Sequence, residues 1–395
     1  MSLGRNLCNA MKEGWEIKKL GEVCEVISGG TPRTNNESYW GGNNMWVTPA
    51  ELNGDKWISH TERNLTDEGV RSAHLQLMPK GTVLLSSRAP IGKIAITNVP
   101  MYCNQGFKNL VCGDKINNLY LYWYLHYNKE YIKALGTGAT FKEISKKVVS
   151  NIDVLLPPIS EQTRIVEELD LLNGILDKKR QQLKELDALC QSIFYDMFGD
   201  PITNEKRWKK SSFGNEFKIM SGGTPKTNII EYWENGDISW IGSNMCHNNI
   251  LYENDGKYIT KKGLDNSSAK LFCEGFVLVA LVGATIGKTA LLKFDTATNQ
   301  NIAGIDVKAN NSFTPEYVYY YLQNLYCLFE AIGGDKFKMA NLSFVRNLQL
   351  HIPPLTLQTE FANKIKSIEH QKELITQSIA ETQTLLDSRM DYYFN

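Results

Sequence analysis

A chain of 395 residues is long enough for two or three domains, each with room for a hydrophobic core. Its residues are 42% hydrophobic and 22% charged, a composition typical of soluble globular proteins. The formal net charge is zero, which on its own argues against a strongly basic nucleic-acid-binding protein.

Membrane, secretory and metal-binding classes find no support in the sequence. The longest strongly apolar run, Phe276 to Val282, is far too short to span a bilayer, and the first fourteen residues are too polar for a signal peptide. The eight cysteines form no C-x-x-C pair and no cluster with histidine, so we expect neither a metal site nor a disulfide framework. A cytoplasmic protein is the expectation.

The first 156 residues predict a mixed globular domain. A short apolar run after glycine, Gly81 to Ser86, predicts a buried strand, and Ile94 to Thr97 its hairpin partner. Leu119 to Leu135 is aromatic-rich and free of glycine, which predicts a helix. Ile152 to Leu156 predicts a final strand that leads directly into Pro157 and Pro158.

Residues 157–198 predict one long helix that starts at the two prolines, because proline is tolerated in the first turn of a helix. Positions spaced alternately by four and three residues form an apolar seam typical of a coiled coil. The apolar seam residues are Ile165, Leu169, Leu172, Leu176, Leu183, Leu186, Cys190, Ile193 and Met197, with Lys179 as the interruption. The alternative is an ordinary amphipathic surface helix.

The chain then repeats itself with a period near 195 residues. Short runs return in the same order: SGGTPRT (28–34) as SGGTPKT (221–227), then Tyr-Trp, Ile-Gly-Lys and Asn-Gln. Strands at 275–280, 290–293 and 348–352 and a helix at 315–332 are predicted in the second half. Residues 353–394 repeat the long helix, with a weaker seam whose apolar members include Phe361, Ile365, Ile368, Ile375, Ile379 and Leu386.

We therefore expect four segments: an α+β domain at 1–156, a long helix at 157–200, a second α+β domain at 201–352 and a second long helix at 353–395. The two helices should pair antiparallel, as a coiled coil in one chain, which places Lys179 beside Ile375 and Lys372 beside Leu183. Together the helices carry a net charge of −5, which leaves +5 on the rest. That bias is compatible with DNA binding but weak.

No catalytic centre or cofactor site is predicted. Gly283 to Thr289 resembles a phosphate-binding P-loop, but only three residues separate its glycines where the motif needs four, so a turn between strands is favoured. The six histidines are scattered, no G-x-S-x-G elbow occurs, and Pro157-Pro158 and Pro353-Pro354 lack the asparagine and aromatic residues of adenine methyltransferases.

The repeated turns supply candidate DNA contacts. Glycine-rich turns that carry a cation can approach a phosphate, although a tight structural turn capped by threonine is an equal alternative. Two glycine-rich loops that end in Phe-Lys, at 136–142 and 333–338, are candidate phosphate clamps. The phosphate candidates are Arg33, Lys93, Lys142, Lys226, Lys288, Lys336 and Lys338, and the further candidates are Thr31, Ser87, Arg88 and Thr224.

Over nearly its whole length the chain resembles the specificity subunit of type I restriction–modification systems. The resemblance rests on the doubled SGGTP turn, the Tyr-Trp, Ile-Gly-Lys and Asn-Gln runs, and the Leu-Pro-Pro-Ile-Ser-Glu-Gln that opens the first long helix at 156–162. The second half departs from the last motif, because Leu357 stands in the place of Glu161 and only Gln358 is kept.

The resemblance implies two target recognition domains, each reading one half of a bipartite site on double-stranded DNA, with the antiparallel helices between them. It also implies two methyltransferase subunits and ATP-dependent restriction subunits as partners, and no catalysis by this chain itself. Base contacts are expected where the halves differ most, at 52–75 and 246–271. A single-chain methyltransferase-like enzyme with an unrecognised site and a homo-oligomeric scaffold without a DNA role stay as alternatives.

Overall fold

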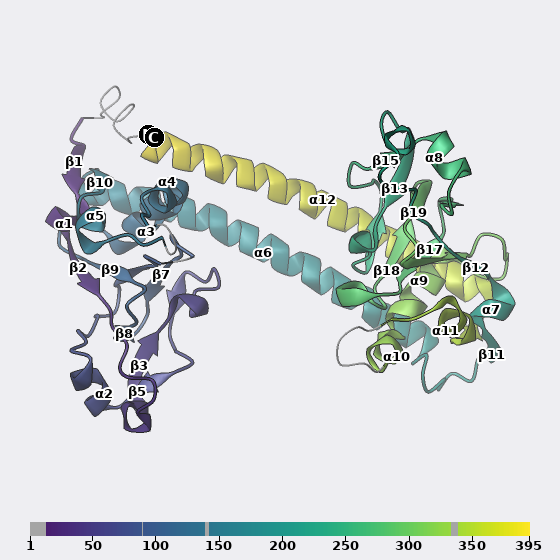
Figure 1. Ribbon diagram of the computed structural model, residues 1–395, viewed down its shortest axis with the longest axis horizontal. Coiled ribbons are helices and arrows are strands. Elements are labelled where there is room, and N and C mark those ends of the chain that lie inside the picture. The colour runs from purple at the N-terminus through teal and green to yellow at the C-terminus, as the bar shows by residue number, and fades with distance from the viewer. Residues whose placement is uncertain (1–12, 89, 139–141, 333–338) are drawn as a thin grey trace. The chain divides into compact units, whose positions relative to one another are not determined.

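The computed structural model describes residues 13–88, 90–138, 142–332 and 339–395. Its contacts divide the chain into two compact units (Figure 1). Unit 1 is Met1–Arg180 with Gln377–Asn395, and unit 2 is Gln181–Thr376. Each long helix therefore contributes one part to each unit, and each unit is described by itself below.

Unit 1 is built on a five-stranded sheet whose strand order is β2-β9-β6-β7-β4. Its strands are β2 (Cys24–Ser28), β4 (Trp57–Ile58), β6 (Val83–Leu85), β7 (Ile94–Thr97) and β9 (Lys108–Cys112). A three-stranded sheet joins β5 (Asn64–Leu65), β3 (Trp40–Val47) and β8 (Tyr102–Cys103), and β1 (Glu16–Lys19) pairs with β10 (Asp153–Leu156). The short helices are α1 (Leu20–Val23), α2 (Asp67–Ser72), α3 (Asn118–Tyr127), α4 (Lys129–Ala134) and α5 (Lys146–Ser150), with 3-10 turns η2 (Glu37–Tyr39) and η3 (Pro49–Glu51).

Unit 2 repeats this plan, with a five-stranded sheet in the order β12-β20-β17-β18-β14. Its strands are β12 (Lys218–Ser221), β14 (Asn249–Leu251), β17 (Val277–Ala280), β18 (Thr289–Leu292) and β20 (Ile302–Asp306). The smaller sheets join β15 (Tyr258–Ile259), β13 (Ile238–Ile241), β19 (Thr296–Thr298) and β16 (Leu271–Phe272), and β11 (Lys209–Ser212) with β21 (Gln349–Ile352). The short helices are α7 (Phe213–Glu216), α8 (Lys261–Asp265), α9 (Pro315–Gln323), α10 (Tyr326–Glu330) and α11 (Leu342–Asn347), with η4 (Ile230–Tyr232), η5 (Ser243–Met245) and η6 (Gly283–Thr285).

The predicted hairpins and the internal repeat are confirmed. Strands β6 and β7 pair antiparallel, as do β17 and β18. Each hairpin turns at a glycine with positive φ, Gly92 at +84° and Gly287 at +74°, a conformation that glycine adopts without strain. The segment that resembled a P-loop is thus a 3-10 turn and a hairpin turn.

The two aromatic helices are shorter than predicted. Helix α3 ends at Tyr127, and the side-chain amide of its C-cap residue Asn128 donates to the Tyr124 carbonyl at 2.9 Å and so competes with the helical hydrogen-bond pattern. In unit 2, α9 ends at Gln323 and α10 begins at Tyr326. Their aromatic side chains fill the space between the sheet and the long helices, where Tyr120 and Tyr317 are fully buried.

The two long helices are present as predicted: α6 (Ile159–Phe198) and α12 (Leu355–Phe394), each of 40 residues. Their seam residues do more than line a coiled coil, because most of them join the hydrophobic core of the unit in which they lie. In unit 1 the buried ones are Ile165, Leu169, Leu176 and Leu386, with Leu172 and Ile379 packed against them. In unit 2 they are Cys190, Phe361, Ile365 and Ile368, with Leu186 and Ile193 packed against them, whereas Leu183 and Ile375 are half-buried.

Antiparallel pairing is seen within each unit, and the rings of Phe194 and Phe361, which meet in unit 2 with centroids 5.8 Å apart, fit the expected register. In unit 1, Lys179 Nζ donates to Ser378 Oγ at 2.6 Å and to Thr382 Oγ1 at 2.8 Å, three or more residues beyond the expected Ile375. In unit 2, Lys372 Nζ lies 2.7 Å from the Asp187 carboxylate, four residues beyond Leu183. Each seam lysine therefore has polar partners on the other helix.

Candidate nucleic-acid interface

The doubled SGGTP turn is held in both units by a pair of tryptophans. In unit 1 the indole N–H of Trp46 donates to the Gly30 carbonyl at 3.0 Å, and that of Trp40 donates to the Arg33 carbonyl at 3.4 Å. The two rings meet edge to face, with centroids 5.2 Å apart. This arrangement fixes the main chain of the turn and leaves the Arg33 side chain exposed.

Unit 2 reproduces the same bonds. Trp240 donates to the Gly223 carbonyl at 3.1 Å and Trp233 donates to the Lys226 carbonyl at 3.2 Å, with centroids again 5.2 Å apart. The Lys226 side chain is exposed. Within the described part of the chain, neither Arg33 nor Lys226 has a side-chain hydrogen bond or ion pair.

The other residues of the turn serve packing. A Cβ at Gly29 would collide with the main-chain oxygen of Asn104, and one at Gly222 would collide with Thr298. Thr31 donates its hydroxyl to the side-chain carbonyl of Gln105. Thr224 does the same to Gln300 at 2.7 Å. The repeated Asn-Gln run is therefore a partner of the repeated turn, which supports the structural role for the glycines and threonines.

The two Gly-Lys lysines occupy matching places but have different partners. Lys93 Nζ donates to the Pro49 carbonyl at 3.0 Å. Lys288 Nζ lies 4.1 Å from the centroid of the Tyr326 ring, at cation–π distance. Both side chains are half-buried, so they are less available to a phosphate than Arg33 and Lys226.

Arg88 and Lys108 pair with the same carboxylate, that of Glu143. Arg88 Nε lies 2.9 Å from Glu143, and the nearly buried Lys108 lies 3.4 Å from the same group. Burial raises the pKa of Glu143, but the hydrogen bond from Arg88 and the charge of Lys108 outweigh it and hold this pKa below its usual value.

Ser87 does not fit a DNA contact in this structure. It is fully buried, and its main chain pairs with Gly106 and Ile144, so its hydroxyl cannot reach a ligand without local opening. Lys142 is exposed. Lys336 and Lys338 lie outside the described residues.

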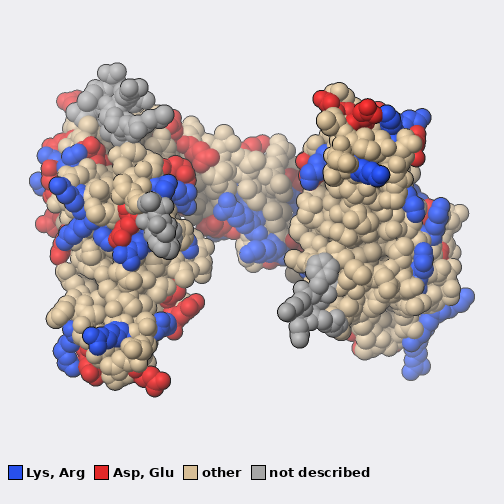
Figure 2. Space-filling model, viewed as in Figure 1, with Lys and Arg blue, Asp and Glu red and all other residues tan. Residues whose placement is uncertain are grey.

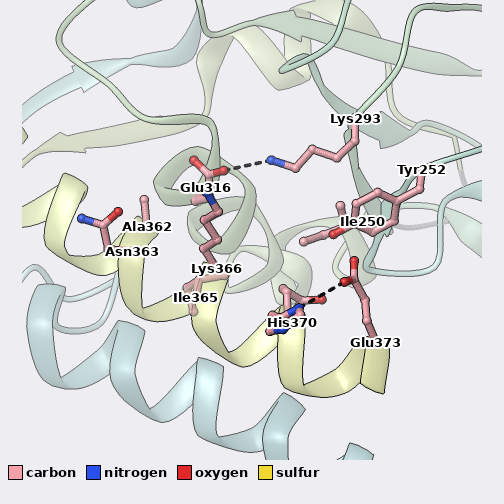
Figure 3. Close-up of a pocket in the computed structure, with 11 residues that line it drawn as sticks. Ile250, Tyr252, Lys293, Glu316, Ala362, Asn363, Ile365, Lys366, His370 and Glu373 are labelled. Carbon is pink, nitrogen blue, oxygen red and sulfur yellow. Dashed lines mark hydrogen bonds and ion pairs between the residues drawn. The ribbon is translucent and has the colours of Figure 1, made fainter. Parts of the chain in front are cut away.

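One cavity in unit 2 holds no recognisable catalytic arrangement among its described lining residues. Its volume is about 500 Å³, and Figure 3 shows His370 and Glu373 of α12 on one side and Tyr252 on the other. His370 Nδ1 lies 3.6 Å from Glu373, and Lys293 lies 3.2 Å from Glu316, so these charges are paired within the cavity wall. No group of three metal-ligating side chains occurs among the described residues.

The role of the glutamine that is repeated near the start of each long helix was not predicted from the sequence. Gln162 is fully buried; its Oε1 accepts from the Asn117 N–H, and its Nε2 donates to the carbonyls of Lys115 and Pro157 at 3.0 and 2.8 Å. Gln358 makes the same three bonds in unit 2. The signal was available, because the glutamine is repeated whereas the preceding Glu161 is not.

Positive charge is not concentrated on the face shown in Figure 2, where Lys and Arg are spread over each unit. The described residues include no helix long and apolar enough to cross a membrane.

Comparisons with known proteins agree on one family. A family profile described as "Type I restriction modification DNA specificity domain" matches the chain twice, at residues 12–188 and 205–383. The MjaIX specificity subunit of a type I restriction enzyme from Methanocaldococcus jannaschii is 28% identical, over 91% of this chain and 89% of that protein. The putative MjaX specificity subunit of the same organism is 25% identical, over 92% and 88%.

Two solved structures share the fold. One belongs to a study of complex assembly and conformational transition of the type I R-M system, with a TM-score of 0.61, 18% identity and coverage of 98% of this chain and 99% of that one. The other is the S subunit of a type I restriction-modification system from M. genitalium, with a TM-score of 0.58, 13% identity and coverage of 97% and 96%.

Proposed function

Because the chain belongs to the family of type I restriction modification DNA specificity domains and carries two of them, we propose that it selects the target of a type I restriction–modification complex. Each unit would act as one target recognition domain and read one half of a bipartite site on double-stranded DNA. The observation that carries this proposal is the pairing of two units that share their scaffold bonds and differ in their exposed segments.

The segments that differ most have the same elements in both units but different side chains. Residues 52–75 contain β4, β5 and α2, and residues 246–271 contain β14, β15 and α8. Residues that are identical in two domains cannot distinguish two different DNA sequences, so base contacts belong to these differing segments. Shared exposed cations are better suited to the phosphates, which are alike at every site.

Arg33, Lys226 and Lys142 support a role in phosphate binding, because all three are exposed and the first two project from turns fixed by tryptophans. Lys338 stays in the proposal from its sequence position alone. Lys93, Lys288 and Arg88 already have partners and are weaker candidates. Alanine at Arg33 or Lys226 is expected to weaken binding equally on all sequences and to reduce the salt-dependence slope by about one.

Catalysis and cofactor binding belong, in this proposal, to other subunits. Two methyltransferase subunits would dock on the chain, and restriction subunits would join that complex in the cytoplasm. The names of the relatives, which are specificity subunits of restriction enzymes, support this division of labour.

The proposal is tested by selecting bound duplexes from a random pool with the full-length chain and sequencing them. The expected result is two half-sites separated by base pairs that carry no preference. Exchange of residues 15–150 for the corresponding domain of a relative should then change one half-site and leave the other. Binding without sequence preference, or a change in both half-sites, would contradict the proposal.

A further inference from the structure

One arginine in unit 1 stands apart from the other cations. Arg63 precedes β5, and its side chain is exposed. Its guanidinium carbon lies 3.6 Å from the centroid of the Trp40 ring and 5.7 Å from that of Trp46. Within the described part of the chain, no carboxylate pairs with it. The group is therefore held by an aromatic face, which occupies none of its hydrogen-bond donors.

Both supports of this arginine are themselves fixed. The Trp40 and Trp46 indoles are tied to the SGGTP turn by the two hydrogen bonds described above. The main-chain carbonyl of Arg63 accepts from the Trp46 N–H at 3.3 Å and from the Thr61 hydroxyl at 3.1 Å. The guanidinium is thus positioned before any ligand arrives, which reduces the entropy lost on binding.

Unit 2 has the same tryptophan pair, but no cation lies over it among the residues that the structure describes. The rings of Trp233 and Trp240 stand 5.2 Å apart and nearly perpendicular, as in unit 1. The residue that precedes β15 is Lys257, and its ammonium lies 3.1 Å from Asp255 instead. Holding the turn therefore does not require an arginine on the rings, so Arg63 is free to serve a purpose specific to unit 1.

We propose that Arg63 is a base-reading residue that binds a guanine in the major groove of the first half-site. The inference rests on the proposed function, because it assumes that unit 1 meets DNA. A planar guanidinium offers two parallel N–H groups, and guanine presents two acceptors, O6 and N7, on its major-groove edge. Adenine and cytosine each present an amino donor on that edge, which an arginine cannot satisfy.

The location favours a base over a phosphate. Arg63 lies in the 52–75 segment, where the two units differ most, and its counterpart Lys257 is paired with Asp255, whereas Arg33 and Lys226 are exposed cations at matching positions of a shared turn. A phosphate contact needs charge but little orientation, and a flexible lysine provides it. A guanidinium held 3.6 Å from the centroid of a fixed ring is better explained by a target whose acceptors have a fixed direction.

The test uses the full-length chain and a random duplex pool, with wild type, Arg63→Ala, Arg63→Lys and the matched control Lys257→Ala. Wild type should prefer guanine over other bases at one position of the first half-site by about 5- to 150-fold. Arg63→Ala should lose that preference, and Arg63→Lys should weaken it because lysine lacks the rigid fork; both should keep the second half-site and the salt slope. Lys257→Ala should leave the first half-site unchanged.

The outcomes separate the competing explanations. A uniform loss of affinity with a salt slope reduced by about one would mark Arg63 as a phosphate contact and overturn the inference. Retention of every base preference in Arg63→Ala would also overturn it. If Arg63→Ala fails to fold, Arg63→Lys decides, because it keeps the stem and the charge. A wild-type chain with no sequence preference at all would refute the proposed function itself.

Discussion

The two units are alike where the sequence repeats and unlike at one contact with the long helices, beside β4 in unit 1 and β14 in unit 2. In unit 1, Lys56 Nζ lies 2.5 Å from the carboxylate of Asp170 on α6, and the Trp123 indole donates to the same carboxylate at 2.7 Å. The ammonium also lies 5.2 and 5.3 Å from the ring centroids of Tyr122 and Trp123. Strand β4 is thereby tied to the helix.

Unit 2 has no such connection at the matching place. Trp57 pairs with Ile96, and Ile250 pairs with Leu291, so Asn249 takes the position of Lys56. Lys366, which corresponds to Asp170 at the repeat offset of 196, lines the cavity beside Ile250. The repeated residues thus hold each domain together and bind it to the start of its long helix, whereas the contact beside β4 and β14 has diverged.

Removal of the aromatic residue that ends each long helix should have the largest effect. Phe394 packs among Tyr120, Tyr124 and Tyr127, and Phe198 packs in unit 2 against Tyr317 and Phe361. Each change to alanine should cost about 3–5 kcal/mol of unfolding free energy, because a large buried ring leaves a cavity. Hydrogen exchange should show the loss in unit 1 for Phe394→Ala and in unit 2 for Phe198→Ala.

Leu385→Ala is the control for that pair, because Leu385 lies on α12 within unit 1 and is 49% exposed. Leu385→Ala should reduce the protection from hydrogen exchange by far less than either aromatic substitution. Equal loss of protection in both units after either aromatic substitution would show that the units do not unfold separately.

Substitution of the two repeated glutamines should lower the free energy of unfolding by equal amounts in the two units. Gln162→Leu and Gln358→Leu each leave a buried N–H and two carbonyls without their side-chain partner, which should cost about 1–3 kcal/mol. Denaturant unfolding combined with hydrogen exchange measures this in each unit. Glu161→Gln, which alters an exposed pair with Arg164, should cost little. A large loss in one copy only would break the equivalence of the repeats.

The Lys56–Asp170 pair should matter in unit 1 only. Lys56→Met keeps the stem but removes the charge, and because the pair is partly exposed we expect a loss of about 1 kcal/mol. The converse experiment places the pair in unit 2 with Asn249→Lys and Lys366→Asp. A double-mutant cycle should give a favourable coupling there. Zero coupling would mean that the backbones, and not only the side chains, differ between the two contacts.

The smallest expected effect concerns pH. The hydrogen bond from Arg389 lowers the pKa of Glu168 below its ordinary value of 4.5; burial opposes this shift, and the Tyr393 hydroxyl assists it. A carboxylate with a lowered pKa in the folded state stabilises unit 1 fully above its unfolded pKa, and this contribution disappears as pH falls through the folded pKa.

Unit 2 has Lys364 at the matching position, paired only with Glu360 on its own helix. Acidification from pH 5 to pH 3 should therefore destabilise wild type more than Glu168→Gln, with the difference confined to unit 1. Denaturant unfolding at both pH values measures the loss of unfolding free energy, and hydrogen exchange shows in which unit the loss occurs. If wild type and Glu168→Gln lose the same stability on acidification, the hydrogen bond from Arg389 does not lower the pKa of Glu168.

Most of the architecture was predictable, because a duplicated sequence shows its own domain plan. The partners of the seam lysines were not predictable, because a flexible lysine stem can carry its ammonium along the partner helix, as Lys372 does toward Asp187. The burial of Ser87 was also hidden, since its neighbour Arg88 suggested a surface turn. Arg63 and Lys56 escaped notice because their partners, Trp40 and Asp170, are distant in sequence.

The division of the chain has a consequence for its synthesis on the ribosome. Unit 2 is one continuous stretch, Gln181–Thr376, so all of its residues are available before the chain ends. Unit 1 must wait for Gln377–Asn395, which supplies the buried residues Leu386, Met390, Tyr393 and Phe394 to its core. During translation the first-made domain therefore stays incomplete for the longest time, with apolar surface exposed. A stop codon within 377–395 would therefore damage unit 1, most of which is made before unit 2.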